Sequence, residues 1–205
     1  MTGWSASTNK GASSSEGYTE EQLRAVTVGE LQPLDSPIVL AEYDPFWPQY
    51  FAEEANSVRR ALGDRALTVE HVGSTSVPGL AAKPVIDIVL VVANSADEPA
   101  YVPLLESAGY VLRIREPDWN EHRLFKGPAR NINLHVFSRD CSEVGRMIAF
   151  RDRLRGSDAD RDAYQSHKRE LAARNWKYVQ NYADAKSAFI SGMLDCGETK
   201  PPSSS

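Results

Sequence analysis

The stretch VEHVGSTSVPGLAAKPVIDIVLVV, from Val69 to Val92, decides the fold of this chain. It begins as a β-strand, turns through Gly73-Ser74, and ends in a strongly apolar strand over Pro84 to Val92. Glycine suits the tight turn through which backbone amides approach a phosphate. Two strands joined by such a turn predict a central part of a β-sheet, with Gly73-Ser74 opening on a cleft.

Asp87 interrupts this second, otherwise apolar strand. Strand alternation places it on one face together with Val85, Val89 and Val91. A carboxylate among apolar side chains is costly unless it is paired, hydrogen-bonded or metal-bound. We favour a functional carboxylate because the glycine turn lies one strand earlier. The alternative is a core aspartate that binds a loop amide.

Periodicity and capping signals extend the prediction along the chain, with a capping box at Thr19 to Gln22. Strands first and helices afterwards indicate an α+β fold, a mixed β-sheet flanked by helices with a C-terminal helical block. We expect a disordered tail (1–17), a short helix and linker (18–37), one domain (38–195) and a second disordered tail (196–205). The predicted strands are 38–43 (or an extended arm), 67–72, 84–92, 110–115, 122–126 and 132–137; the predicted helices are 19–28, 44–62, 99–108, 141–154, 158–174 and 176–193.

The composition is that of an ordinary globular chain, with 205 residues, 25% charged and 41% hydrophobic. Its net charge of −5 argues against nucleic acid or an anionic membrane as a partner. The segment from Arg113 to Lys186 nevertheless carries sixteen Lys and Arg against eleven Asp and Glu. This excess indicates one local anion site, or else a solvated mixture of charges. Two cysteines and no signal-like N-terminus predict a cytoplasmic protein, whose oligomeric state the sequence leaves open.

A second polar face is predicted on the strand over residues 132–137. Its apolar residues alternate with Asn131, Asn133 and His135, so these three share one face. His135 could act as a general base, a phosphate contact or a metal ligand, or could be a hydrogen-bonded structural histidine. Glu70 and His71 precede the glycine turn, and alternation directs only one of them into the cleft. The sequence does not indicate which.

Each of the three C-terminal helices carries a cation within an apolar stripe. Arg151 follows Val144, Met147 and Ile148 at helical spacing, Lys168 lies between Tyr164 and Leu171, and Lys186 is central to the last stripe. Any one of these side chains could extend its charge to solvent along the apolar surface. Together they predict a shared anion site that faces Asp87.

The motifs of this chain resemble those of the GrpB family. GSTSVPGLAAKPVIDI is similar to that family's central motif almost residue for residue, and Tyr43-Asp44-Pro45, Asn133 to Val136, and Phe150-Arg151-Asp152 also match. The resemblance covers roughly residues 38 to 194. More broadly, a Gly-Ser turn followed by a carboxylate within hydrophobics is similar to the signature of the nucleotidyltransferase superfamily. There the turn holds phosphates and two carboxylates hold divalent metal.

The resemblance implies two alternative functions. In the first, the chain is a nucleotide-dependent transferase acting on a small acceptor, with Asp87 and His135 catalytic. Phosphates would be held by Gly73, Ser74, Lys83, Arg151, Lys168 and Lys186, and Mg²⁺ or Mn²⁺ by Asp87 and Glu70; no organic cofactor is implied. Val89 stands where the superfamily has its second carboxylate, which leaves the metal site reduced. The second function is a non-catalytic module that binds a small phosphorylated or acidic ligand, as in GrpB-like domains fused to dephospho-coenzyme A kinase.

Overall fold

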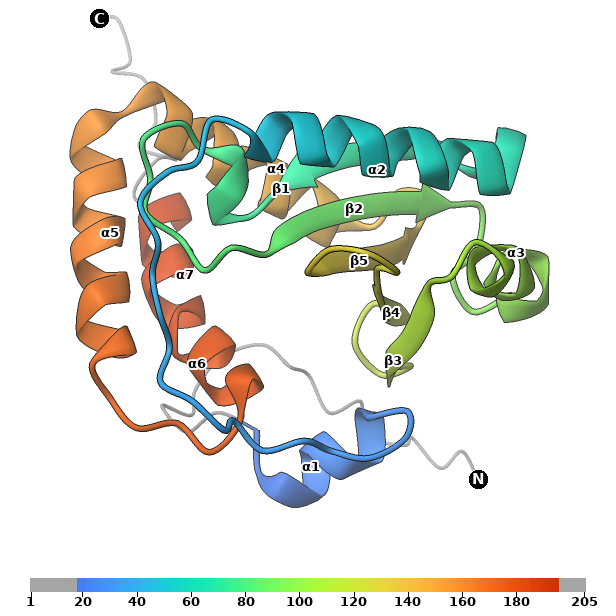
Figure 1. The fold of residues 1–205 in the computed structure, drawn as a ribbon, viewed down its shortest axis with the longest axis horizontal. Coiled ribbons are helices and arrows are strands. Elements are labelled where there is room, and N and C mark those ends of the chain that lie inside the picture. The colour runs from blue at the N-terminus through green and yellow to red at the C-terminus, as the bar shows by residue number, and fades with distance from the viewer. Residues whose placement is uncertain (1–17, 196–205) are drawn as a thin grey trace, which may run out of the picture.

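Five strands form one mixed sheet in the order β1-β2-β5-β4-β3 (Figure 1). The computed structural model describes residues 18–195; the tails expected at 1–17 and 196–205 lie outside the described residues. β2 and β5 are parallel, and the other neighbouring pairs are antiparallel. The strand bounds are β1 Thr68–Val72, β2 Ile86–Val92, β3 Val111–Glu116, β4 His122–Lys126 and β5 Ile132–Ser138. The mixed sheet and the α+β class are as predicted.

One part of the sheet prediction is wrong, because β1 lies at the edge and not in the centre. β2 follows β1 as an antiparallel neighbour, and β5 then pairs in parallel with β2. A parallel pair needs a long crossover connection. Here that connection contains β3 and β4, which take the far side of the sheet and leave β1 with a single partner strand.

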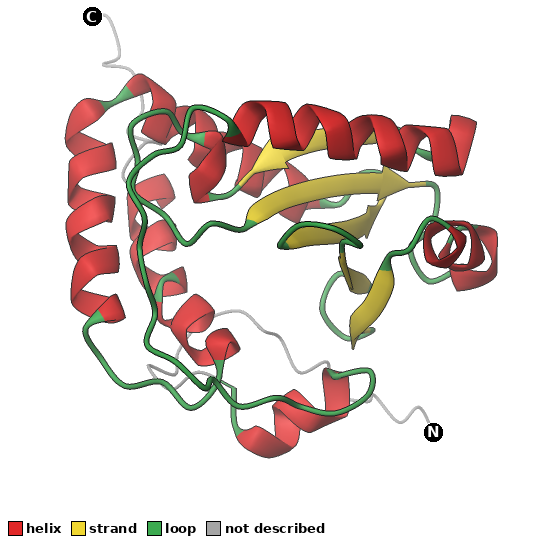
Figure 2. Cartoon of the chain, viewed as in Figure 1, coloured by secondary structure: helices red, strands yellow, loops and turns green. Residues whose placement is uncertain are grey.

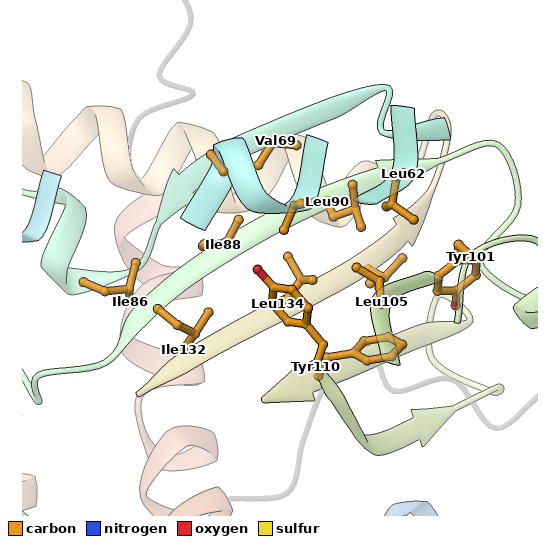
Figure 3. Close-up of a cluster of buried hydrophobic side chains, with 14 of the residues drawn as sticks. Leu62, Val69, Ile86, Ile88, Leu90, Tyr101, Leu105, Tyr110, Ile132 and Leu134 are labelled. Carbon is orange, nitrogen blue, oxygen red and sulfur yellow. The ribbon is translucent and has the colours of Figure 1, made fainter. Parts of the chain in front are cut away.

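Helices cover both faces of the sheet. The apolar residues of β2 that alternate with Asp87, including Ile88 and Leu90, pack with Leu134 against α2 (Trp47–Leu62) and α3 (Val102–Ser107), as Figure 3 shows. The opposite face carries Asp87 and packs Val89 and its neighbours against α4 (Ser142–Gly156). The first face forms the main hydrophobic core, whereas the second carries Asp87 beside a smaller apolar cluster.

The C-terminal block contains α5 (Asp158–Ala172), α6 (Val179–Ala185) and α7 (Ser187–Asp195) (Figure 2). The prediction of one continuous helix over 176–193 is wrong. The backbone N–H of Lys186 bonds to Ala183, three residues back, which closes α6 with a tight turn. The Lys186 carbonyl then accepts from Ile190 and starts α7. The chain therefore turns at Lys186, the cation of this stripe.

A long arm joins α1 (Glu20–Val26) to α2. The predicted capping box at Thr19 and Gln22 is present. The predicted strand at 38–43 is only one bridge, between Ala41 and Ala82. It does not extend because Pro84 has no N–H and the N–H of Leu80 is bonded to Val77 within a turn. The arm is thus held mainly by its apolar side chains against α5 and α6.

Within residues 18–195, the helices all fall short of the length and apolarity that crossing a bilayer requires.

Candidate functional site

Asp87 lies directly against the glycine turn. In the antiparallel register it faces Val72, the residue before Gly73. Gly73 has φ 68° and ψ −173°, a backbone conformation that only glycine adopts readily. A Cβ atom at Gly73 would lie 2.4 Å from Oδ2 of Asp87. The turn and the carboxylate therefore form one unit, as the sequence predicted.

Two side chains of β5 contact the Asp87 carboxylate. Asn133 is its partner across the parallel pair, and the Asn133 Nδ2 group donates to Oδ1 of Asp87 at 2.7 Å. Nε2 of His135 lies 3.6 Å from the same oxygen. Asp87 and His135, which the sequence analysis proposed as catalytic residues, therefore lie on the same side of the sheet. Asn133 was predicted only to lie on this face, and its direct bond to Asp87 is new.

Lysine side chains interact electrostatically with this carboxylate. Nζ of Lys126 donates to Oδ1 of Asn133 at 2.6 Å. Lys186, at the turn between α6 and α7, has its ammonium 4.6 Å from the centre of the Tyr182 ring. Burial would raise the pKa of Asp87, but the His135 ring, Asn133 and the charge of Lys186 hold that pKa below its usual value.

The lysines differ in exposure: Lys168 is buried, Lys83 and Lys186 are half-buried, and Lys126 is exposed. Burial lowers the pKa of Lys186 to about 8, while the charge of Asp87 acts in the opposite direction. Burial also lowers the pKa of Lys83, and the charge of Lys126 lowers it further. Lys168 is almost fully buried, donates to the carbonyl of Ala81, and has its pKa lowered to about 7 by burial and by the charge of Lys186.

Positive charge therefore exceeds negative charge at this face. The side chains that interact electrostatically with Asp87 include Lys83, Lys126 and Lys186. The charges of Lys168 and Lys186 also repel each other. We call Asp87, Lys83, Lys126 and Lys186 the lysine cluster. Among the residues that the structure describes, three lysines of this cluster interact with the Asp87 carboxylate, and Asp184 is a second carboxylate that acts on Lys186. An anionic ligand would relieve their mutual repulsion.

Arg151 does not join this cluster, which corrects the prediction of three converging cations. Its guanidinium donates to Glu70 Oε2 at 2.8 Å, to the carbonyl of His71 at 3.0 Å and to Asp152 at 2.7 Å. These acceptors satisfy its charge. Arg151 thus links the end of β1 to α4 and has a structural role.

Alternation in β1 separates Glu70 from His71. Glu70 lies on the Asp87 side, where it pairs with Arg151. His71 lies on the α2 side, stacked on Phe51, with its ring centroid 4.8 Å from that of Phe51. Burial lowers the pKa of His71 to about 4, so this ring is neutral near pH 7. Glu70 is therefore the residue of this pair on the Asp87 side.

The turn after Gly73 is a short 3₁₀ helix, Ser74–Ser76. The hydroxyl of Ser76 donates to the Gly73 carbonyl at 2.6 Å, and the guanidinium of Arg155 donates to the Ser76 carbonyl at 2.8 Å. The amides of Ser76 and Val77 are used inside the turn. These bonds hold the turn in one shape beside Asp87, with Ser74 as its first residue.

The donor set does not fit the divalent metal that the sequence led us to expect. Across residues 18–195, no group of three or more His, Cys, Asp or Glu side chains is arranged to hold an ion. Glu70 is neutralised by Arg151, and Oδ1 of Asp87 already accepts from Asn133. Mg²⁺ needs several oxygen ligands. We therefore do not assign Asp87 and Glu70 as metal ligands.

The model of the family described as GrpB protein matches residues 37–195. This chain belongs to the GrpB family. A UPF0157 protein of Halalkalibacterium halodurans is 59% identical over 90% of this chain and 95% of its own length. One from Streptomyces coelicolor is 43% identical over 75% of this chain and 80% of its own. The match thus extends through all the elements that build the lysine cluster.

A solved GrpB structure shares the architecture. The crystal structure of conserved protein GrpB from Enterococcus faecalis has a TM-score of 0.67 and 34% sequence identity, and covers 77% of this chain and 95% of that chain. A dephospho-CoA kinase of Mycolicibacterium paratuberculosis is 44% identical over 37% of this chain, but over only 19% of its own length. These comparisons show the GrpB family and its α+β fold.

Proposed function

We propose that the lysine cluster beside the Gly73 turn binds a small polyanionic ligand with phosphate groups. The observation that carries the proposal is the excess of cations over carboxylates, with the pKa of Lys186 lowered to about 8 by burial. Ammonium groups held out of water lack the solvation that would stabilise their charge. A polyanion would supply that stabilisation, and no metal ion is required.

The ligand would lie between the Gly73 turn, β5 and the turn at Lys186. Lys83 and Lys126 approach from the sheet side and Lys186 from the helical block. Lys168 is too deeply buried for direct contact and would act through Lys186. Asp87 would orient the lysine side chains, and its carboxylate would neutralise part of their positive charge when no ligand is bound. Several charged contacts to one ligand favour a diphosphate or triphosphate over a single phosphate.

A nucleotide-dependent transferase is the fuller form of this proposal. The pairing of His135 with Asp87 favours it, because a histidine oriented by a carboxylate can accept a proton from an attacking hydroxyl. Attack on a phosphorus atom also requires neutralised phosphate charge, which the lysines would provide. The same proposal includes two further points. The Gly73-Ser74 turn and Asp87 resemble the nucleotidyltransferase signature, and the protein would act in the cytoplasm.

The alternative is a binding module without catalysis. The partial matches to dephospho-CoA kinases favour it, because they cover less than a quarter of those proteins. Both functions share the binding step, and they differ in whether the bound nucleotide then reacts. Release of pyrophosphate or phosphate from a bound nucleoside triphosphate would support the transferase. Binding without any turnover would support the module.

A thermal-shift screen tests the binding step. We expect nucleoside triphosphates and inorganic triphosphate to raise the melting temperature in the presence of a chelator, because lysines rather than metal hold the phosphates. A hundredfold excess over Kd corresponds to about 2.7 kcal/mol of stabilisation. Inorganic sulfate at equal ionic strength is the control for general salt effects. Stabilisation by sulfate equal to that by triphosphate would contradict a specific polyanion site.

The affinity should depend on pH in a defined direction. In the empty protein the pKa is about 7 for Lys168 and about 8 for Lys186, and a bound polyanion would raise both values. Binding then takes up protons at pH values above these pKa values. We expect the affinity for inorganic triphosphate to be highest near pH 7 and to fall above pH 8, by up to about tenfold per pH unit for each lysine. Titrations at constant ionic strength measure this, and an affinity that rises from pH 7 to pH 9 would contradict it.

A further inference from the structure

A chain of polar side chains crosses the sheet from Asp87 to Tyr18, in the segment before α1. His135 Nδ1 lies 3.0 Å from His122 Nε2, and His122 Nδ1 lies 2.7 Å from Oε2 of Glu116. The hydroxyl of Tyr18 donates to the other oxygen of Glu116 at 2.6 Å. The chain therefore passes from β2 through β5, β4 and β3 to the segment that precedes α1.

Packing fixes the orientation of these rings. His122 and Glu116 are buried, with 3% and 7% of their surface exposed. The His122 ring is stacked between its neighbours, 5.2 Å from the centroid of His135 and 4.8 Å from that of Phe137, and Trp119 meets its edge. These ring contacts hold His122 in place, and its hydrogen bond to His135 orients the second ring. The contacts between ring nitrogens are therefore set by the fold.

When both rings are neutral and Glu116 is a carboxylate, the hydrogen bonds assign the protons. Glu116 accepts from the Tyr18 hydroxyl with one oxygen, and as a carboxylate it accepts from the Nδ1–H of His122 with the other. The Nε2 atom of a neutral His122 is then an acceptor, so the proton between the rings belongs to Nδ1 of His135. This leaves Nε2 of His135, 3.6 Å from Oδ1 of Asp87, as the atom that gains or loses a proton, and it is the protonated ring that stabilises the Asp87 carboxylate.

We propose that Glu116 and His122 are positioning residues that hold His135 as the Nδ1–H tautomer, so that His135 exchanges its proton only at Nε2, toward Asp87. When Nε2 takes a proton from a hydroxyl, the O–H bond breaks, the N–H bond forms, and the charge of the imidazolium faces Asp87. The role toward a ligand rests on the proposed function, whereas the tautomer does not.

Two carboxylates lie along this chain of side chains. Asp87 lies 3.6 Å from Nε2 of His135, and Glu116 is bonded to His122, whose ring contacts Nδ1 of His135. Glu116 and His122 therefore have a function beyond packing, because they set which nitrogen of His135 is free to take a proton.

The ring nitrogens can be observed directly by ¹⁵N NMR on the full chain without ligand. The chain has four histidines, and His71 is an internal control. The Thr75 hydroxyl donates to the carbonyl of Val85, so it accepts from Nε2–H of His71. We expect neutral His122 and His135 to carry their protons on Nδ1 and His71 on Nε2. A neutral His135 protonated on Nε2 would overturn the proposal.

A variant pair separates positioning from packing. In Glu116→Gln the carboxylate that accepts from Nδ1–H of His122 is lost, and we expect the ¹⁵N signals of neutral His135 to show a mixture of Nδ1–H and Nε2–H forms. Glu53→Gln removes an equal charge from the exposed surface of α2, and there His135 should keep the Nδ1–H form. An unchanged His135 tautomer in folded Glu116→Gln would also overturn the proposal. If that variant does not fold, the tautomer of His135 in the wild-type protein still tests the proposal. Failure of triphosphate binding would leave both NMR results untouched, so the two proposals fail separately.

Discussion

Replacement of Gly73 by alanine should lower the free energy of unfolding by about 2–6 kcal/mol. The backbone at Gly73, with φ 68° and ψ −173°, is one that side-chain-bearing residues rarely adopt, and this strain costs about 1–3 kcal/mol. The new methyl group would also lie 2.4 Å from Oδ2 and 2.9 Å from Cβ of Asp87. Moving Asp87 aside costs about 1–3 kcal/mol more and would disturb its contacts with Asn133 and His135.

Gly63 provides a matched control. It also has a positive φ, 55°, but no atom lies within 4 Å of a Cβ atom built there. Gly63→Ala should therefore show backbone strain without the clash. Urea unfolding of the two variants measures the difference, which we expect to be at least about 1 kcal/mol. Equal losses in both variants would show that contact between the turn and Asp87 contributes nothing.

Lys186→Met should weaken triphosphate binding by about ten- to a hundredfold. A hydrogen bond to a charged group contributes about 1.5–3 kcal/mol, which corresponds to this range. Removing an ammonium whose pKa burial has lowered to about 8 also removes a desolvation cost. Asp87 keeps Asn133 and His135 as partners. The empty variant should therefore unfold within about 1 kcal/mol of the wild type.

Lys177→Met is the control for this variant. Lys177 is exposed and pairs at the surface with Glu20, so its loss changes the net charge equally without touching the lysine cluster. Calorimetric titration with inorganic triphosphate compares the two variants. If Lys186 served only as the structural partner of an acid, its loss would destabilise the protein by about 3–5 kcal/mol and leave binding unchanged. That result would contradict the assigned role.

Local patterns were sufficient to predict the sheet face that carries Asp87. The apolar run around Asp87 marks a buried strand, and alternation with a period of two places Asp87 and His135 each among known neighbours. Gly73 follows the end of β1, and Asp87 lies near the start of β2. Because β1 and β2 are antiparallel neighbours, the end of one lies beside the start of the other, which brings the turn and the carboxylate together. These contacts can be predicted because each involves only strands that are neighbours in the sheet.

Contacts between distant segments were not predictable in the same way. Helical spacing showed that Arg151 faces the body of the protein, but not that Glu70 would meet it there. The edge position of β1 and the contact between His122 and His135 both depend on strand order, which alternation does not determine. The break at Lys186 likewise has no glycine or proline to mark it. Such features follow from tertiary packing.

Isothermal titration calorimetry of the wild-type chain with inorganic triphosphate, at pH 8 in the presence of a chelator, tests the central claim most directly. The lysine cluster predicts saturable binding of one triphosphate per chain without metal. It also predicts net proton uptake, seen as a difference between buffers of unlike ionisation heat, because Lys168 and Lys186 become fully charged. Binding that requires added Mg²⁺, or an absence of saturable binding under any of these conditions, would contradict the claim.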